Sequence, residues 1–263
     1  MPLVEVVEAE GVVQLSLNAP PVNGYSYDMM RQIDAAVLDA RMDPSVHVIV
    51  ITGQGEKFFC AGADIGMLQK ADPTFKYYFC LHANETLNRL EQTPKLTIAA
   101  LNGHCVGGGL EVAMACDLRI ARKGGGKLGL PEVNLGVLPG TGGTQRLARM
   151  VGKSKALELM IDGATFDFER GVDLGLVNRV VEADDAAGFL AKVHEIARGY
   201  CPPQKASYAV GRIKRAVCSG ADMSFEQGLT LERELQQLLF TSSDAREGLA
   251  AYVDKRKPAF KGE

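Results

Sequence analysis

Three consecutive glycines and a glutamate follow a buried apolar segment and form the most reactive-looking stretch of the chain. Residues 96–101, with the sequence LTIAAL, have the composition of a buried strand, and Gly107, Gly108 and Gly109 lead into an apolar helix predicted over 110–116. The first N–H groups of a helix lack intrahelical partners and carry partial positive charge. This stretch could therefore stabilise negative charge that develops on a substrate oxygen.

Glu111 lies one residue into that apolar helix. A carboxylate in such surroundings is either paired or functional, because burying it alone and ionised is costly. An exposed or capping carboxylate is the ordinary alternative for a glutamate on a helix. The triple glycine makes the functional and the ordinary interpretations about equally weighted, and residues alone leave both open.

Two further segments of the chain contain candidate site residues. The small residues Ala61, Gly62 and Ala63 would allow a ligand to approach the backbone closely, whereas Asp64 is better explained as the N-cap of a following helix. Glu132, after Pro131, adds another carboxylate in a segment predicted to be a loop.

The elements that must position these residues alternate between strands and helices over the first 200 residues. Strands are predicted at 4–7, 12–17, 46–52, 96–101, 117–122 and 177–181, and helices at 75–90 and after Asp28, which can cap the first one. Helical patterns then dominate, at 186–200, 203–219, 224–240 and 244–255. The pattern predicts an α/β core followed by a helical appendage, whose broad apolar faces favour packing on another helix or subunit.

Composition excludes several functional classes. The 29 basic and 32 acidic residues give a net charge of −3 and a pI near 5.9, which does not favour nucleic acid as a partner. No apolar run approaches the roughly 20 residues that span a bilayer, and we expect a cytoplasmic protein without a membrane partner. The six cysteines and four histidines lack the spacing of a zinc site, so we expect no metal and reduced thiols.

Together the motifs resemble the crotonase superfamily, and specifically its enoyl-CoA hydratases. The resemblance covers essentially the whole chain in the right order, and it rests on residues 58–65, 102–111, 115–117, 131–136, 139–146, 246–248 and 255–257. It implies an α/β fold, a crotonase-type spiral of ββα turns, with a spiral core over 1–200 and a helical C-terminal trimerisation region over 201–263. A homotrimer or a dimer of trimers is the assembly that it implies.

The same resemblance implies the reaction and the residues that carry it. An acyl-CoA thioester would place its carbonyl on the backbone N–H groups of Ala63 and Gly108, while Glu111 activates water and Glu132 exchanges the proton at C2. Coenzyme A is then part of the substrate, and no separate cofactor is expected. The further substrate-binding residues that it implies are Ala61, Gly62, Asp64, Ile65, Gly140, and, from a neighbouring subunit, Lys257 and Phe260.

Departures from the family pattern keep other functions open. Residues 18–25, with the sequence NAPPVNGY, differ from the usual segment that helps to hold the CoA phosphates. The alternatives are an enoyl-CoA isomerase, a hydratase of branched, aromatic or alicyclic acyl-CoA, and a non-catalytic or RNA-binding relative. Acyl-chain preference is expected to depend on side chains around residues 67–68, 77–78, 112 and 138.

Overall fold

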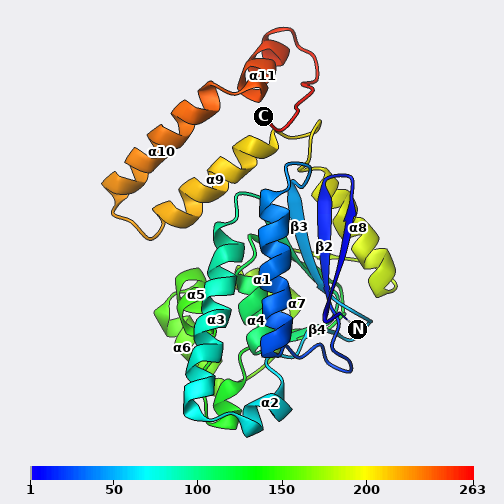
Figure 1. Cartoon of the computed structure of the whole chain (residues 1–263), viewed down its shortest axis with the longest axis vertical. Coiled ribbons are helices and arrows are strands. Elements are labelled where there is room, and N and C mark those ends of the chain that lie inside the picture. Colours follow the sequence, from blue (N-terminus) through cyan, green and yellow to red (C-terminus); the bar gives the residue numbers. More distant parts are fainter. Residues whose placement is uncertain (1) are drawn as a thin grey trace.

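The computed structural model describes residues 2–263 and contains two mixed β-sheets surrounded by helices (Figure 1). The larger sheet has the strand order β1-β2-β3-β5-β7-β10. Only β1 and β2 pair in the antiparallel sense, and all other neighbours are parallel. Its strands are β1 Val4–Ala9, β2 Val12–Leu17, β3 Val48–Gly53, β5 Leu96–Leu101, β7 Leu118–Arg122 and β10 Arg179–Val181.

The central strands of this sheet are buried on both faces. In β3, Ile49 and Ile51 point into a core shared with the helices of the site, while Val48 and Val50 point into a second core beneath α8 (Ala186–Arg198). A parallel strand that is covered on both sides has a continuous apolar sequence rather than an alternating one. The strand predicted at 96–101 has the same character and is confirmed as β5.

The smaller sheet, β4-β6-β8-β9, carries the backbone of the site. Its strands are only two or three residues long: β4 Phe58–Cys60, β6 His104–Val106, β8 Lys127–Gly129 and β9 Phe166–Asp167. Segments this short show no hydrophobic period, so the sequence predicted none of them as an independent strand. Their pairing sets the residues after β4 beside those after β6, because the two strands run parallel.

Capping side chains define where the helices near the site begin. α1 (Tyr27–Met42) is capped by Ser26, so the prediction that Asp28 caps it is wrong, and Asp28 lies in its first turn instead. Asp64 caps α2 (Ile65–Lys70) as predicted. The other helices of the core are α3 Pro73–Gln92, α4 Gly108–Met114, α5 Gly143–Val151, α6 Lys153–Asp162 and α7 Phe168–Asp173.

Several predicted boundaries need correction. Glu132 does not lie in an open loop but begins a short 3₁₀ helix, η1 (Glu132–Leu135). The apolar helix predicted at 110–116 begins two residues earlier, at Gly108, because glycines can form its first turn as well as precede it. The helix predicted at 203–219 begins at Ser207, beyond the two prolines of a turn, and the final strand begins at Arg179. Helices α6 and α7 were not predicted.

The last helices extend away from the sheets (Figure 1). They are α9 Ser207–Gly220, α10 Phe225–Phe240 and α11 Ser243–Val253, and α9 packs along α10 while also contacting α3 and β5. Within residues 2–263, no helix has both the length and the apolar content required to cross a membrane.

A buried ion pair joins α9 to the core. The Nζ atom of Lys214 lies 2.9 Å from Oδ2 of Asp117, and the two side chains are only 5% and 14% exposed. Lys214 also donates to the carbonyl of Lys95 at 3.0 Å, while Asp117 accepts from the N–H and the hydroxyl of Thr97. Burial raises the pKa of Asp117, and the ammonium of Lys214 opposes that shift. The pair therefore links α9 to the core through buried charges.

Replacing Lys214 with methionine is expected to destabilise the protein by about 3–5 kcal/mol, because it leaves a buried carboxylate without its counter-charge. Urea unfolding at a fixed protein concentration measures the loss. The double variant Lys214→Met/Asp117→Asn removes both charges and should recover part of it. A loss below about 1 kcal/mol for the single variant would show that the pair behaves like an exposed one.

Candidate active site

A small pocket of about 100 Å³ brings together most of the residues predicted for the site. It lies between the loop after β4, the start of α4, η1 and the segment that precedes α5. The predicted residues in its wall are Ala61, Gly62, Ala63, Ile65, Gly108, Glu111, Glu132 and Gly140. These come from four separate stretches of the chain, so the fold rather than local sequence assembles the pocket.

Two backbone N–H groups in the wall, those of Ala63 and Gly108, are available to a ligand. Among the hydrogen bonds of residues 2–263, none uses either group as a donor. A Cβ atom on Gly62, whose φ is +95°, would lie 3.0 Å from the Gly108 nitrogen, which shows how closely the two loops approach. Gly108 is the first residue of α4, so the helix dipole adds partial positive charge there. The pair can bind a negatively charged oxygen.

Only glycine fits at position 108. A Cβ atom there would lie 2.3 Å from the hydroxyl oxygen of Tyr25, a contact that side chains do not make. Tyr25 is itself almost fully buried and stacks on Phe79 of α3, so it has little room to move. The close approach brings the start of α4 against Tyr25 and fixes the direction of the Gly108 N–H.

Glu111 is buried, at 2% exposure, and its carboxylate is held by three donors. Oε1 accepts the N–H of Thr141 at 2.8 Å and that of Gly143 at 2.7 Å, and Oε2 accepts the hydroxyl of Thr141. A carboxylate offers about four lone-pair positions. Three are occupied here, so one position on Oε2 is left for a donor that enters the pocket, such as water.

Tyr25 extends this arrangement by one further hydrogen bond. Its hydroxyl lies 3.0 Å from that of Thr141, and since Thr141 donates to Glu111, Tyr25 donates to Thr141. Burial, and next the charge of Glu111, raise the pKa of Tyr25 well above its ordinary value, so the tyrosine keeps its proton. The sequence did not predict this series of hydrogen bonds from Tyr25 through Thr141 to Glu111. Tyr25 and Thr141 nevertheless lie in segments that the sequence analysis named, 18–25 and 139–146.

Glu132 has the opposite environment. It is half-buried at the start of η1, and no group within residues 2–263 donates to its buried Oε2 atom. Burial raises the pKa of Glu132 to about 7, and the charge of Glu111 contributes in the same direction, while Lys76 acts against it. Glu132 can therefore hold or release a proton near neutral pH, whereas Glu111 is fixed as an acceptor.

Three predicted site residues lie outside this pocket. Asp64 caps α2 rather than lining the wall. Lys257 is exposed near the end of the chain, and Phe260 lies in an apolar groove against α10 and α11. Of the side chains expected around the acyl group, Leu68 and Leu138 line the pocket. Val112 is in the core, Met67 packs against the core, and the tyrosines at 77 and 78 are largely exposed. Lys76 lines the pocket and was not predicted.

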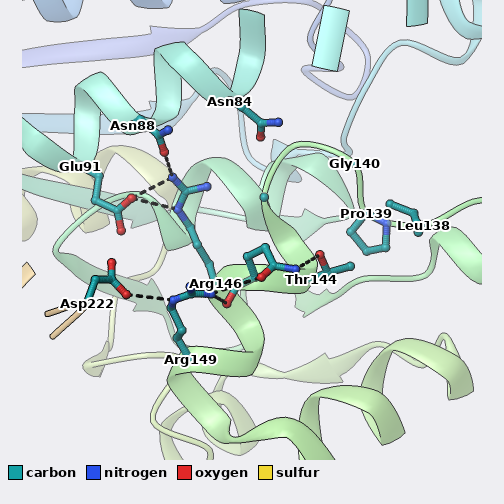
Figure 2. Close-up of a pocket in the computed structure, with 12 residues that line it drawn as sticks. Asn84, Asn88, Glu91, Leu138, Pro139, Gly140, Thr144, Arg146, Arg149 and Asp222 are labelled. Atoms are coloured by element: carbon teal, nitrogen blue, oxygen red, sulfur yellow. Dashed lines mark hydrogen bonds and ion pairs between the residues drawn. The ribbon is translucent and has the colours of Figure 1, made fainter. Parts of the chain in front are cut away.

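A larger polar cavity lies on the other side of the segment that holds Glu111, and the two cavities share Leu138 and Gly140. Figure 2 shows Arg146 crossing this cavity from α5 towards α3. Its guanidinium donates to Glu91 at 2.8 Å and to Asn88 at 2.9 Å. A Cβ atom on Gly142 would lie 2.1 Å from Nη1, so the guanidinium packs directly on the backbone that leads to Gly143. Arg146 thereby braces one of the donors to Glu111.

Comparison with known protein families and relatives shows which family the chain belongs to. The family model described as enoyl-CoA hydratase/isomerase matches residues 7–263. A probable enoyl-CoA hydratase of Bacillus subtilis is 38% identical, with 96% of each chain covered. A crotonyl-CoA hydratase of Syntrophomonas wolfei is 36% identical over 95% of each chain, and a short-chain-enoyl-CoA hydratase of Clostridium acetobutylicum is 35% identical over 96% of this chain and 95% of its own.

Solved structures show the same architecture. An enoyl-CoA hydratase structure from Geobacillus kaustophilus superimposes with a TM-score of 0.95 at 44% identity, covering 100% of this chain and 98% of the other. One from Bacillus anthracis gives a TM-score of 0.91 at 33% identity, covering 99% and 100%. The predicted α/β crotonase fold is thus confirmed, with its two mixed sheets and C-terminal helices. The chain belongs to the enoyl-CoA hydratase/isomerase family.

Proposed function

We propose that this protein adds water across the 2,3 double bond of a 2-enoyl-CoA thioester to give a 3-hydroxyacyl-CoA. The observation that carries the proposal is the pairing of two unlike carboxyl groups in one pocket. Glu111 is held by three donors, and Glu132 has an unpartnered oxygen and a pKa of about 7. Two free backbone N–H groups lie in the same pocket wall.

The N–H groups of Ala63 and Gly108 receive the thioester oxygen. Attack of water at C3 moves electron density through C2 onto that oxygen, so donors aimed at it stabilise the transition state more than the substrate. Backbone donors suit this role because they do not titrate and need no reorganisation. Loss of one such donor typically costs about 10²- to 10³-fold in rate.

The two glutamates divide the remaining work. Water donates to the open lone pair of Glu111 Oε2, which orients its oxygen towards C3 and accepts the proton. Protonated Glu132 donates a proton to C2, and a pKa of about 7 suits that donation near neutral pH. Gly140 lies in the wall beside them, where its N–H can contact the water.

The test is the loss of absorbance of the conjugated thioester of crotonyl-CoA, followed by product analysis. We expect 3-hydroxybutyryl-CoA to form. Crotonyl-CoA is the first choice because the pocket is small and two relatives are named for crotonyl and short-chain enoyl substrates. An enzyme that binds acyl-CoA without hydrating crotonyl-CoA or longer enoyl-CoAs, and that shifts a 3-enoyl double bond, would be an isomerase.

The assembly belongs to the same proposal. Several apolar side chains of the last helices are largely exposed in the single chain, among them Phe225, Tyr252 and Val253 at 82%, 85% and 77%. A homotrimer, or a dimer of trimers, would cover such faces. Lys257 and Phe260 would then approach the CoA or acyl group bound by a neighbouring subunit. Sedimentation analysis gives the mass, and a monomer would contradict this part of the proposal.

Arg146 is expected to act as a positioning residue. Arg146→Met removes the brace on the backbone of residues 142 and 143, so we expect kcat to fall by about tenfold with little change in KM, because small displacements of catalytic groups are costly. Arg149→Met is the matched control, since Arg149 is one turn further along α5 and pairs with Asp222 at the surface. Equal effects of the two substitutions would contradict a specific role for Arg146.

A further inference from the structure

A second pocket, of about 250 Å³, lies at the opposite end of the larger sheet and shares no residue with the site. Four basic side chains line it, those of Arg41, His47, Lys95 and Arg212, together with Ser207 and Tyr208, and this group is called the basic pocket below. It is formed where the end of α1 meets the start of α9, in the upper part of Figure 1, whereas α2 lies at the bottom.

The basic side chains of this pocket have no carboxylate partner. Within residues 2–263, Arg41, Lys95 and Arg212 form no ion pair. Arg41 instead donates to the hydroxyl of Thr93 and the carbonyl of Arg89, and Lys95 donates to two backbone carbonyls that follow α1. A carbonyl carries no net charge, so these contacts hold the cations in place without neutralising them. Asp43 forms no ion pair with Lys95, but its charge opposes the lowering of the Lys95 pKa by burial.

Arg212 is the least satisfied member. Its Nη2 atom donates to the hydroxyl of Tyr208 at 2.8 Å, and its guanidinium carbon lies 4.5 Å from the centre of that ring. Its Nε atom is buried and has no acceptor within residues 2–263. A buried donor on a charged group that finds no acceptor is costly, so Arg212 is an incompletely satisfied cation in the wall of this pocket.

Two further features make the pocket favourable to an anion. Helix α9 begins here at Ser207, and its N-cap Ala206 offers no side-chain acceptor, so the N-terminal partial charge faces the same region. The hydroxyl of Ser207 lies 2.9 Å from Nδ1 of His47, which fixes the ring beside the pocket. Desolvation, and next the charge of Lys95, lower the pKa of His47.

We propose that the basic pocket binds a phosphate-type oxyanion. Phosphate presents acceptors in several directions at once and suits the guanidinium and ammonium groups of Arg212, Arg41 and Lys95, which line the pocket together. The pocket has room for more than a bare phosphate, so a free ion and the phosphate of a small ester both fit its chemistry.

Calorimetric titration of the intact protein with potassium phosphate, against potassium chloride of equal ionic strength, tests the proposal. We expect saturable binding to the wild type and binding at least about tenfold weaker in Arg212→Gln, a loss typical of a charge-assisted hydrogen bond. Arg215→Gln is the matched control, because Arg215 is exposed on the same helix three residues later and should bind as the wild type does. A parallel titration with a nucleoside 5′-monophosphate distinguishes a free ion from an ester.

Two results would overturn the proposal. One is the absence of saturable phosphate binding to the wild type, and the other is equal affinity in the wild type and Arg212→Gln. If phosphate does not bind and Arg212→Gln lowers the mass measured by sedimentation, an acidic group of a second copy occupies the pocket instead. Arg212→Lys, which retains the charge but loses the planar donor pair, should bind phosphate with intermediate affinity and guards against a folding defect.

Discussion

Glu111→Gln is expected to lower kcat for crotonyl-CoA hydration by about 10³-fold, within the range for loss of a positioned general base. Glutamine is nearly isosteric, and its single oxygen can still accept the N–H groups of Thr141 and Gly143. Its amide nitrogen would then take the place of Oε2. That nitrogen cannot accept a proton from water, so the open lone-pair position is lost while the loop remains anchored.

The comparison with Glu111→Ala separates catalysis from folding. Alanine leaves two backbone N–H groups and a threonine hydroxyl without their buried acceptor, and each such loss costs about 1–3 kcal/mol. We therefore expect kcat to fall strongly in both variants but only the alanine variant to be markedly less stable in urea. Glu85→Gln, at an exposed position of α3, serves as the control for charge. A glutamine variant with more than about a tenth of wild-type kcat would contradict the assigned role.

The sequence predicted the site better than it predicted the residues that support it. The glycine-rich and apolar surroundings of Glu111 left two interpretations open, and the family resemblance implied the roles of Glu111 and Glu132. The structure brings both residues to one pocket. The bond between Tyr25 and Thr141 joins residues 116 positions apart, and nothing in either local pattern indicates it. Arg146 likewise depends on a partner in a different helix. Side-chain networks of this kind require the tertiary fold before they can be seen.

The same limit applies to the fold. Long segments with a clear period, such as β5 and α10, were predicted within a few residues because burial of one face or both dictates their composition. The three-residue strands β4 and β6 were not predicted, although they lead directly into the loops that contain Ala63 and Gly108. Their pairing is enforced by the parallel neighbours in the small sheet rather than by propensity. The least predictable elements are thus the ones that align the two N–H donors.

Glu132 provides the second large effect, because its function depends on an environment that disfavours its charge. Its unpartnered buried oxygen lies in a pocket with a second carboxylate, and burial raises its pKa from an ordinary value of 4.5 to about 7. A carboxyl group that is protonated near neutral pH can act as a general acid. Glutamine cannot supply a proton, so we expect Glu132→Gln to lower kcat by about 10²- to 10⁴-fold.

The pH profile of the wild type tests this assignment directly. Hydration requires protonated Glu132, so kcat/KM should fall as pH rises above about 7. The residual rate of Glu132→Gln should lack that inflection, because the titrating group has been removed. Glu85→Gln should retain it. A wild-type rate that stays constant from pH 6 to 9, a range that brackets the pKa by about one to two units, would contradict the role of Glu132 as the acid.

The pH dependence of folding stability tests the raised pKa of Glu132 independently of activity. The pKa of Glu132 is higher in the folded state than in the unfolded state, so between the two values the folded protein binds more protons. The stabilisation linked to this proton is fully present below about pH 4.5 and is lost as pH rises through about 7. Glu132→Gln removes the cost of burying the charge. The Tm of this variant relative to the wild type should therefore be higher at pH 8 than at pH 5. A difference of the opposite sign would show that folding stabilises the Glu132 carboxylate, and it would contradict the role of Glu132 as a general acid.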